Sequence, residues 1–147
     1  MNVVRNKQLR IRQALYFRKK LHPQEMNEEM KRISSFLKEK SIEHTWLIVS
    51  SNLIAEQTTS GYVIEIEIIC PIEGEFQSNE RYHYLENVLV DNALYVRYDG
   101  EEDHLQEAYE ELSVYMKLNQ LTPIESAYCV TIKEPTTNDT NCIVDIY

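Results

Sequence analysis

Aromatic side chains are the residues of this chain best suited to ligand-binding chemistry. The sequence holds ten tyrosines and one tryptophan among 147 residues. Aromatic faces bind flat apolar or cationic molecules, and tyrosine hydroxyls can orient them. The candidates for lining a ligand cavity are Tyr16, Trp46, Tyr95, Tyr109 and Tyr128. The same rings could instead fill core gaps between a sheet and its helices, and the sequence leaves both interpretations open.

Patterns typical of catalysis or metal binding are missing from the sequence. Three cysteines without CxxC spacing predict reduced thiols rather than disulfides or a zinc site: Cys70, Cys129 and Cys142. The four histidines stand singly, and there is no GxSxG motif or P-loop. Cys129 could act as a nucleophile, but nothing in the sequence supplies a base for it. We therefore expect no enzymatic activity, no metal and no cofactor.

The chain repeats itself at a distance of 79 residues. ALYFR at 14–18 returns as ALYVR at 93–97, and a gapless alignment of residues 14–42 with 93–121 has seven identities in 29 positions. Apolar residues match as well, at helical spacing. The sequence therefore predicts an internal duplication, with repeat one at about residues 8–72, a connector at 73–87 and repeat two at about 88–147.

Each repeat has the same order of expected elements. An extended run (9–21 and 86–99) precedes an amphipathic helix, and two strands around a polar turn follow. In the last strand of repeat one, Glu65 and Glu67 alternate with buried isoleucines. These carboxylates could form an acid/base pair, but a solvated face is the commoner role. The whole chain is thus predicted to be one α+β domain, a tandem duplication of a strand–helix–strand–strand unit with antiparallel sheets backed by two helices.

Charge is unevenly distributed along the chain. Residues 1–72 carry 11 Lys/Arg against 8 Asp/Glu, a net +3, and residues 73–147 carry 4 against 16, a net −12. Such an acidic chain is not expected to bind nucleic acid directly. No long apolar run or leader peptide is present, so we expect a cytoplasmic protein without membrane contact. The opposite charges of the halves permit a homodimer.

Several short motifs resemble the GyrI-like small-molecule-binding domain, which is also the effector-binding domain of AraC- and MerR-type bacterial regulators. The matching residues of repeat two are Tyr95, Gly100, Ala108-Tyr109, Tyr128, Glu134-Pro135 and Asp145-Ile146-Tyr147. One position departs from the family pattern. The family carries a buried glutamate after the first tyrosine of the penultimate strand, where it pairs with cationic ligands, and this chain has Cys129 there. Glu125 could replace that acid only if the strand register shifted.

The resemblance implies a protein that binds a small apolar or aromatic ligand between its two repeats, through the five aromatic candidates and Cys129. Because both repeats use the entire chain, we expect a stand-alone protein without a helix-turn-helix segment. An alternative is a protein-interaction module resembling gyrase inhibitors, with the acidic half as its contact surface. Hydrolase activity, reported in the wider family, is a weaker alternative because Cys129 replaces the pocket carboxylate.

Overall fold

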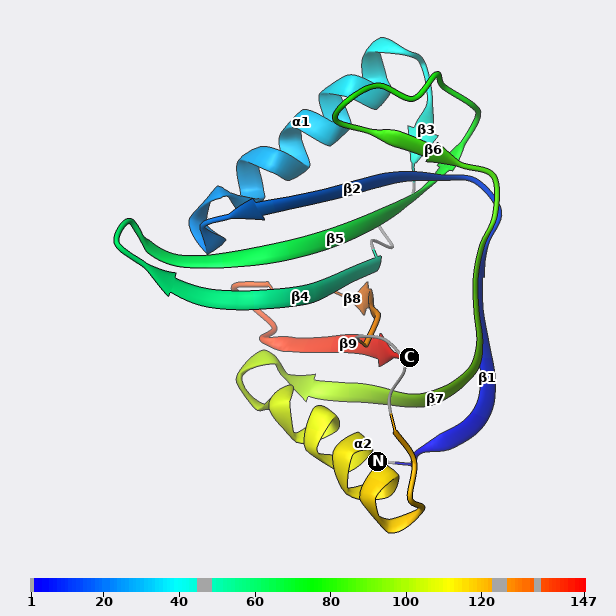
Figure 1. The fold of residues 1–147 in the computed structure, drawn as a ribbon, viewed down its shortest axis with the longest axis vertical. Coiled ribbons are helices and arrows are strands. Elements are labelled where there is room, and N and C mark those ends of the chain that lie inside the picture. The colour runs from blue at the N-terminus through cyan, green and yellow to red at the C-terminus, as the bar shows by residue number, and fades with distance from the viewer. Residues whose placement is uncertain (1, 45–48, 123–126, 134–135) are drawn as a thin grey trace. The chain divides into compact units, whose positions relative to one another are not determined.

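The computed structural model describes residues 2–44, 49–122, 127–133 and 136–147. It divides the chain into two compact units. The repeat-one unit is Ile11–Val88, and the repeat-two unit combines Met1–Arg10 with Leu89–Tyr147. Each unit places one α-helix against antiparallel strands (Figure 1). The predicted α+β class with two helices and antiparallel sheets is confirmed.

In its described residues, the repeat-one unit contains one helix and five strands. In chain order they are β2 (Ala14–Leu21), α1 (Met26–Glu39), β3 (Glu43–His44), β4 (Val49–Thr58), β5 (Gly61–Glu73) and β6 (His83–Leu85). The sheet order is β4-β5-β2-β6, and β3 pairs with β5. A 3-10 turn at Pro23–Glu25 precedes the helix, and a proline is favoured at such a start. α1 buries Ile33 and Leu37 against strand residues such as Phe17 and Ile66.

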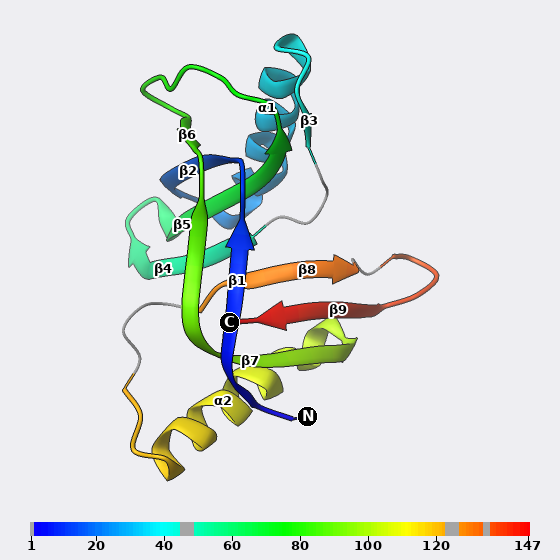
Figure 2. The same ribbon diagram turned by 90° about the vertical axis from the view of Figure 1, so that its right-hand side faces the viewer.

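The described part of the repeat-two unit contains the second helix and four strands. They are β1 (Val4–Ile11), β7 (Val88–Glu101), α2 (Gln106–Leu118), β8 (Cys129–Lys133) and β9 (Asn141–Ile146). The order within the unit is β1-β7-β9-β8, and Figure 2 shows β1 beside β7. α2 buries Ala108 and Leu112 in a core with Val96 and Val144. The predicted strand–helix–strand–strand order is present as β2-α1-β4-β5 and β7-α2-β8-β9, and β1, β3 and β6 are added to it.

The tyrosine of the repeated phrase makes an equivalent cross-strand contact in both units. In β2, Arg18 is opposite Glu67 of β5, and in β7, Arg97 is opposite Asp145 of β9. The tyrosine two residues before each arginine donates its hydroxyl hydrogen to the same acid, at 2.9 Å in repeat one and 2.8 Å in repeat two. The shared Tyr-x-Arg of ALYFR and ALYVR is thus explained by an acid on the neighbouring strand.

The extended run predicted at residues 9–21 is interrupted in the structure. It contains the end of β1 and all of β2, separated at Arg12 and Gln13. The Gln13 carbonyl accepts a hydrogen bond from the backbone of Ile72, and its side chain bonds Gly74 and Tyr84. These contacts hold the chain at the point where it changes direction. The connector at 73–87 includes β6.

Glu65 and Glu67 are half-buried rather than fully solvated. Glu65 pairs with Arg18 at 2.8 Å, and Glu67 accepts the bond from Tyr16. Within the residues that the structure describes, both helices fall short of the length and apolarity that a bilayer-spanning helix needs.

Candidate functional site

A cavity of about 500 Å³ lies in the repeat-two unit. Its walls come from α2, the first half of β7, β1, and residues flanking β8 and β9. This volume falls in the range of small-molecule sites, roughly 300–1,000 Å³. The lining residues are Arg5, Asn6, Leu89, Val90, Asp91, Asn92, Ala93, Leu94, Tyr109, Leu112, Ser113, Met116, Leu121, Thr122, Ala127, Tyr128 and Tyr147.

One face of α2 forms the helical wall of this cavity. Tyr109, Leu112, Ser113 and Met116 all line it. Their spacing of three, one and three residues places them on neighbouring rows of a helix. Leu112 is buried in the core, whereas Ser113 is exposed. The helical wall therefore consists of apolar and aromatic groups, with a small polar residue, Ser113, on its solvent-exposed side.

Two of the tyrosines that line the cavity are paired through their backbones. The backbones of Tyr128 and Tyr147 exchange both hydrogen bonds, at 3.1 and 2.9 Å. Residues paired in this way in antiparallel strands have neighbouring side chains on one face. Both side chains line the cavity. With Tyr109, three tyrosine side chains line the cavity.

Asparagines with left-handed backbone occur in both long strands at the cavity. Asn6 of β1 has φ 56° and Asn92 of β7 has φ 52°, and both line the cavity. Asparagine tolerates this region better than most residues with a side chain, because its short amide can hydrogen-bond locally. Each strand departs from regular extended geometry where it borders the cavity.

Cys129, the first residue of β8, is hydrogen-bonded to the Tyr109 hydroxyl. Burial, followed by the contact with Cys129, raises the pKa of Tyr109 above its usual range. Burial also raises the pKa of Cys129, and the bond from Tyr109 offsets this only in part. Both groups are therefore protonated and uncharged at neutral pH. The position where the family pattern has an anion carries a neutral thiol that is already bonded to a tyrosine.

Among the described residues that line the cavity, formal charge is balanced: Arg5 and Asp91 are the charged ones, one of each sign. Arg5 is exposed, and the Asp91 carboxylate accepts the backbone N–H of Asn92 at 2.9 Å. The described lining is thus largely apolar with polar groups at its borders. Glu125, the alternative acid of the sequence analysis, lies outside the described residues.

The structure places the six predicted site residues in different surroundings. Tyr109 and Tyr128 line the cavity. Cys129 is hydrogen-bonded to the hydroxyl of Tyr109. Tyr95 lies in the same unit, where its ring packs on Tyr147 at 5.1 Å between centroids and its hydroxyl binds Asp145. Tyr16 belongs to the repeat-one unit, and Trp46 lies outside the described residues. The predicted cavity between the repeats stays a prediction.

Sequence reasoning missed several residues of this site. Arg5 and Asn6 could not be found, because no local pattern assigns the first strand to the second repeat. Leu112 and Met116 follow Tyr109 at spacings of three and four residues, which is one helix face. That shared face was the available signal, since residues on one helix face contact the same neighbours. Within the described ranges, no group of three His, Cys, Asp or Glu side chains is arranged to hold a metal ion.

Comparisons with known proteins identify the fold. The crystal structure of the EcmrR C-terminal domain matches with a TM-score of 0.67 and 14% identity, over 99% of this chain and 96% of that chain. The chain has the fold of that domain. EcmrR in the cryo-EM structure of its DNA complex, EcmrR-RPo, matches with a TM-score of 0.69 and 12% identity, over 98% of this chain. The match spans 56% of that EcmrR chain.

This structural likeness supports the GyrI-like fold that the sequence motifs resembled. No family model matches the chain, and no curated protein matches it either. The similarity to known proteins is thus a similarity of fold.

Proposed function

We propose that this chain is a regulatory small-molecule-binding domain whose ligand occupies the cavity of the repeat-two unit. The observation that carries the proposal is the cavity of about 500 Å³ with three tyrosines in its walls, Tyr109, Tyr128 and Tyr147. The likeness to EcmrR, which was solved in complex with DNA, supports a regulatory role. The chain would act as the ligand-sensing part of such a system.

The preferred ligand is an uncharged, flat molecule with an aromatic part. A buried anion is the usual way to select a cation, because an unpaired charge is costly in an apolar cavity. Here the corresponding position holds the protonated thiol of Cys129, bonded to Tyr109. Tyrosine faces contribute apolar contact without requiring charge on the ligand. We infer that neutral aromatic compounds bind better than their cationic analogues.

The proposal includes binding and no chemical conversion. A thiol acts as a nucleophile in its ionised form. Burial raises the pKa of Cys129, and the partner on its sulfur is Tyr109, whose own pKa is also raised. Neither group is suited to accept a proton at neutral pH. The hydrolase alternative would need a base that this pair does not supply.

Thermal shift with paired compounds tests this function. The panel contains neutral aromatic amphiphiles, each matched with a quaternary ammonium analogue. We expect the neutral members to raise the melting temperature, because ligand binding stabilises the folded state. Tyr128→Ala removes one wall and should weaken the best binder about tenfold.

Two neighbouring residues of α2 provide a matched control. Ser113→Phe places a ring at the cavity and should block binding, whereas Val114→Phe adds the same ring where Val114 is exposed and does not line it. Equal binding by both variants, or no shift with any compound, would overturn the proposed site. Tighter binding of the cationic analogues would overturn only the ligand class.

A second candidate function is binding of a basic protein partner. Exposed acids extend from the 3-10 turn at Glu102–His104 along α2: Glu102, Asp103, Glu107, Glu110 and Glu111. Such a surface attracts cationic partners by long-range electrostatics. Gyrase supercoiling in the presence of excess protein tests the resemblance to gyrase inhibitors. Inhibition that Glu110→Lys/Glu111→Lys abolishes and Ser113→Phe leaves unchanged would support this second function; unaffected supercoiling counts against it.

A further inference from the structure

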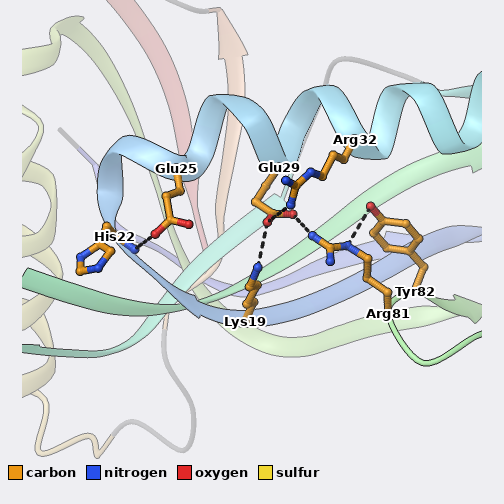
Figure 3. Close-up of polar contacts among 7 residues, drawn as sticks. All are labelled: Lys19, His22, Glu25, Glu29, Arg32, Arg81 and Tyr82. Carbon is orange, nitrogen blue, oxygen red and sulfur yellow. Dashed lines mark hydrogen bonds and ion pairs between the residues drawn. The ribbon is translucent and has the colours of Figure 1, made fainter. Parts of the chain in front are cut away.

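A buried carboxylate in the repeat-one unit, outside the cavity described above, is surrounded by three cations. Glu29 of α1 is 1% exposed. Its oxygens contact Lys19 of β2 at 3.1 Å, Arg32 of α1 at 3.2 Å and Arg81 of the connector at 2.5 Å. Figure 3 shows the three basic side chains pointing to this one carboxylate. We call these four residues the Glu29 cluster.

The Glu29 cluster carries more positive charge than its own stability requires. Three cations around one carboxylate leave a surplus of two positive charges. Burial alone raises the pKa of Glu29, but hydrogen bonds from Arg81 and then Lys19 outweigh burial and hold it below its usual value. One or two partners suffice to neutralise a buried acid. Nearby Glu25 accepts the backbone N–H of His22 at 2.9 Å, and Glu28 is exposed.

The basic groups are held in place and still have unused donors. The Arg81 guanidinium lies over the rings of Phe17 and Tyr82, 5.5 and 5.8 Å from their centroids, and its Nε donates to the Tyr82 hydroxyl. In the described part of the chain, Nη1 of Arg81 and both Nε and Nη2 of Arg32 have no protein partner. The side chains of Lys19 and Arg81 are 38% exposed and that of Arg32 is 55% exposed. They therefore face solvent on one side and Glu29 on the other.

The second repeat shows that the fold does not need this cluster. At positions 79 residues after Lys19, Glu29 and Arg32, it has Tyr98, Ala108 and Glu111. There Tyr98 and Ala108 are buried in an ordinary apolar core. Since apolar residues fill the same helix–sheet contact, a buried charge at this place is not the simplest way to stabilise the unit. Its presence in one repeat and not in the other points to a role other than folding.

We propose that the Glu29 cluster binds a phosphate group on the solvent side of Lys19, Arg32 and Arg81. Guanidinium groups present paired N–H donors that match phosphate oxygens, and charge-assisted bonds of this kind are the stronger ones. Glu29 is a positioning residue: it fixes the cations before the ligand arrives, so less side-chain freedom is lost on binding. The phosphate is either free or part of a small organic molecule.

An NMR titration at neutral pH and constant ionic strength tests this site. Inorganic phosphate and phenyl phosphate are added separately, with chloride as the reference anion, while arginine Nε–Hε signals are followed. We expect saturable shifts of the Arg81 and Arg32 signals with at least one phosphate. The compound that binds more tightly identifies the source of the phosphate group.

Arg32→Gln is the decisive variant because Arg81 and Lys19 still neutralise Glu29, so the fold is kept. Loss of one charge-assisted contact should weaken phosphate binding about tenfold. Lys31→Gln, the adjacent exposed position on α1, changes the net charge equally and should bind as the unchanged protein does. Equal weakening by both variants would show a nonspecific charge effect and overturn the proposal. Shifts no larger with phosphate than with chloride would overturn it as well.

Discussion

Gly100 near the end of β7 is a residue whose identity is set by one close neighbour. A Cβ atom at this position would lie 2.8 Å from the Tyr98 hydroxyl oxygen and 3.1 Å from its ring carbon Cζ. Tyr98 is 5% exposed, and its hydroxyl donates to the backbone carbonyl of Glu101. The tyrosine therefore cannot move aside without losing core packing and a hydrogen bond. Steric space, rather than backbone conformation, requires glycine here.

We expect Gly100→Ala to destabilise the protein by about 1–3 kcal/mol, the range typical of overpacking. Chemical denaturation measures the change in the free energy of unfolding. The Tyr98→Phe background removes the nearest oxygen, so the same glycine substitution should cost less there. An equal cost in both backgrounds would show that the hydroxyl contact is not responsible.

Strand pairs β2–β5 and β7–β9 use the same Tyr–Arg–acid arrangement with different strengths. In repeat two, Arg97 makes two hydrogen bonds to Asp145, at 2.7 and 2.9 Å, and Tyr95 adds a third. Asp145 is 5% exposed. In repeat one, the arginine turns to Glu65 instead, and the acid equivalent to Asp145 is only half-buried. Because Asp145 is more buried and accepts more hydrogen bonds, the arrangement of Tyr95, Arg97 and Asp145 contributes more to stability than its repeat-one counterpart.

Asp145→Asn should therefore cost about 2–3 kcal/mol, because it leaves Arg97 and Tyr95 without their charged acceptor. Glu67→Gln, the equivalent change in β5, should cost less than about 1 kcal/mol since solvent can replace part of its contacts. Denaturation curves of the two variants measure both costs. A larger loss for Glu67→Gln would contradict this ranking of the strand pairs.

At the scale of the whole molecule, buried acids make stability depend on pH. Although burial opposes it, hydrogen bonds from Arg81 and Lys19 lower the pKa of Glu29, and those from Arg97 and Tyr95 lower that of Asp145. An acid with a lowered pKa in the folded state contributes its full stabilisation above its unfolded pKa, about 4. This contribution is lost as the pH falls through the folded-state pKa.

We expect the free energy of unfolding to fall as the pH drops below about 4, while these two acids add no slope near neutral pH. Urea denaturation across this range measures the effect. Glu29→Gln and Asp145→Asn should each be less stable at pH 7 and show a shallower decline in acid. Curves parallel to that of the unchanged protein would mean that other groups control acid unfolding.

Local patterns in the sequence determined the main elements of this protein. Helical spacing of apolar residues predicted α1 and α2, because this signal depends on neighbours within one or two turns. The duplication predicted the α+β class and the shared strand–helix–strand–strand order. Two of the aromatic candidates, Tyr109 and Tyr128, line the cavity found in the structure.

Tertiary structure alone decided which distant residues meet. The assignment of Met1–Arg10 to the repeat-two unit brings Arg5 and Asn6 to the cavity, and the connector brings Arg81 to Glu29. These contacts join residues 52 or more positions apart in the chain. No periodicity carries such information, because it depends on how strands pair and where a connector packs. The sequence determined the repeated unit, and long-range packing determined which distant residues each unit brings together.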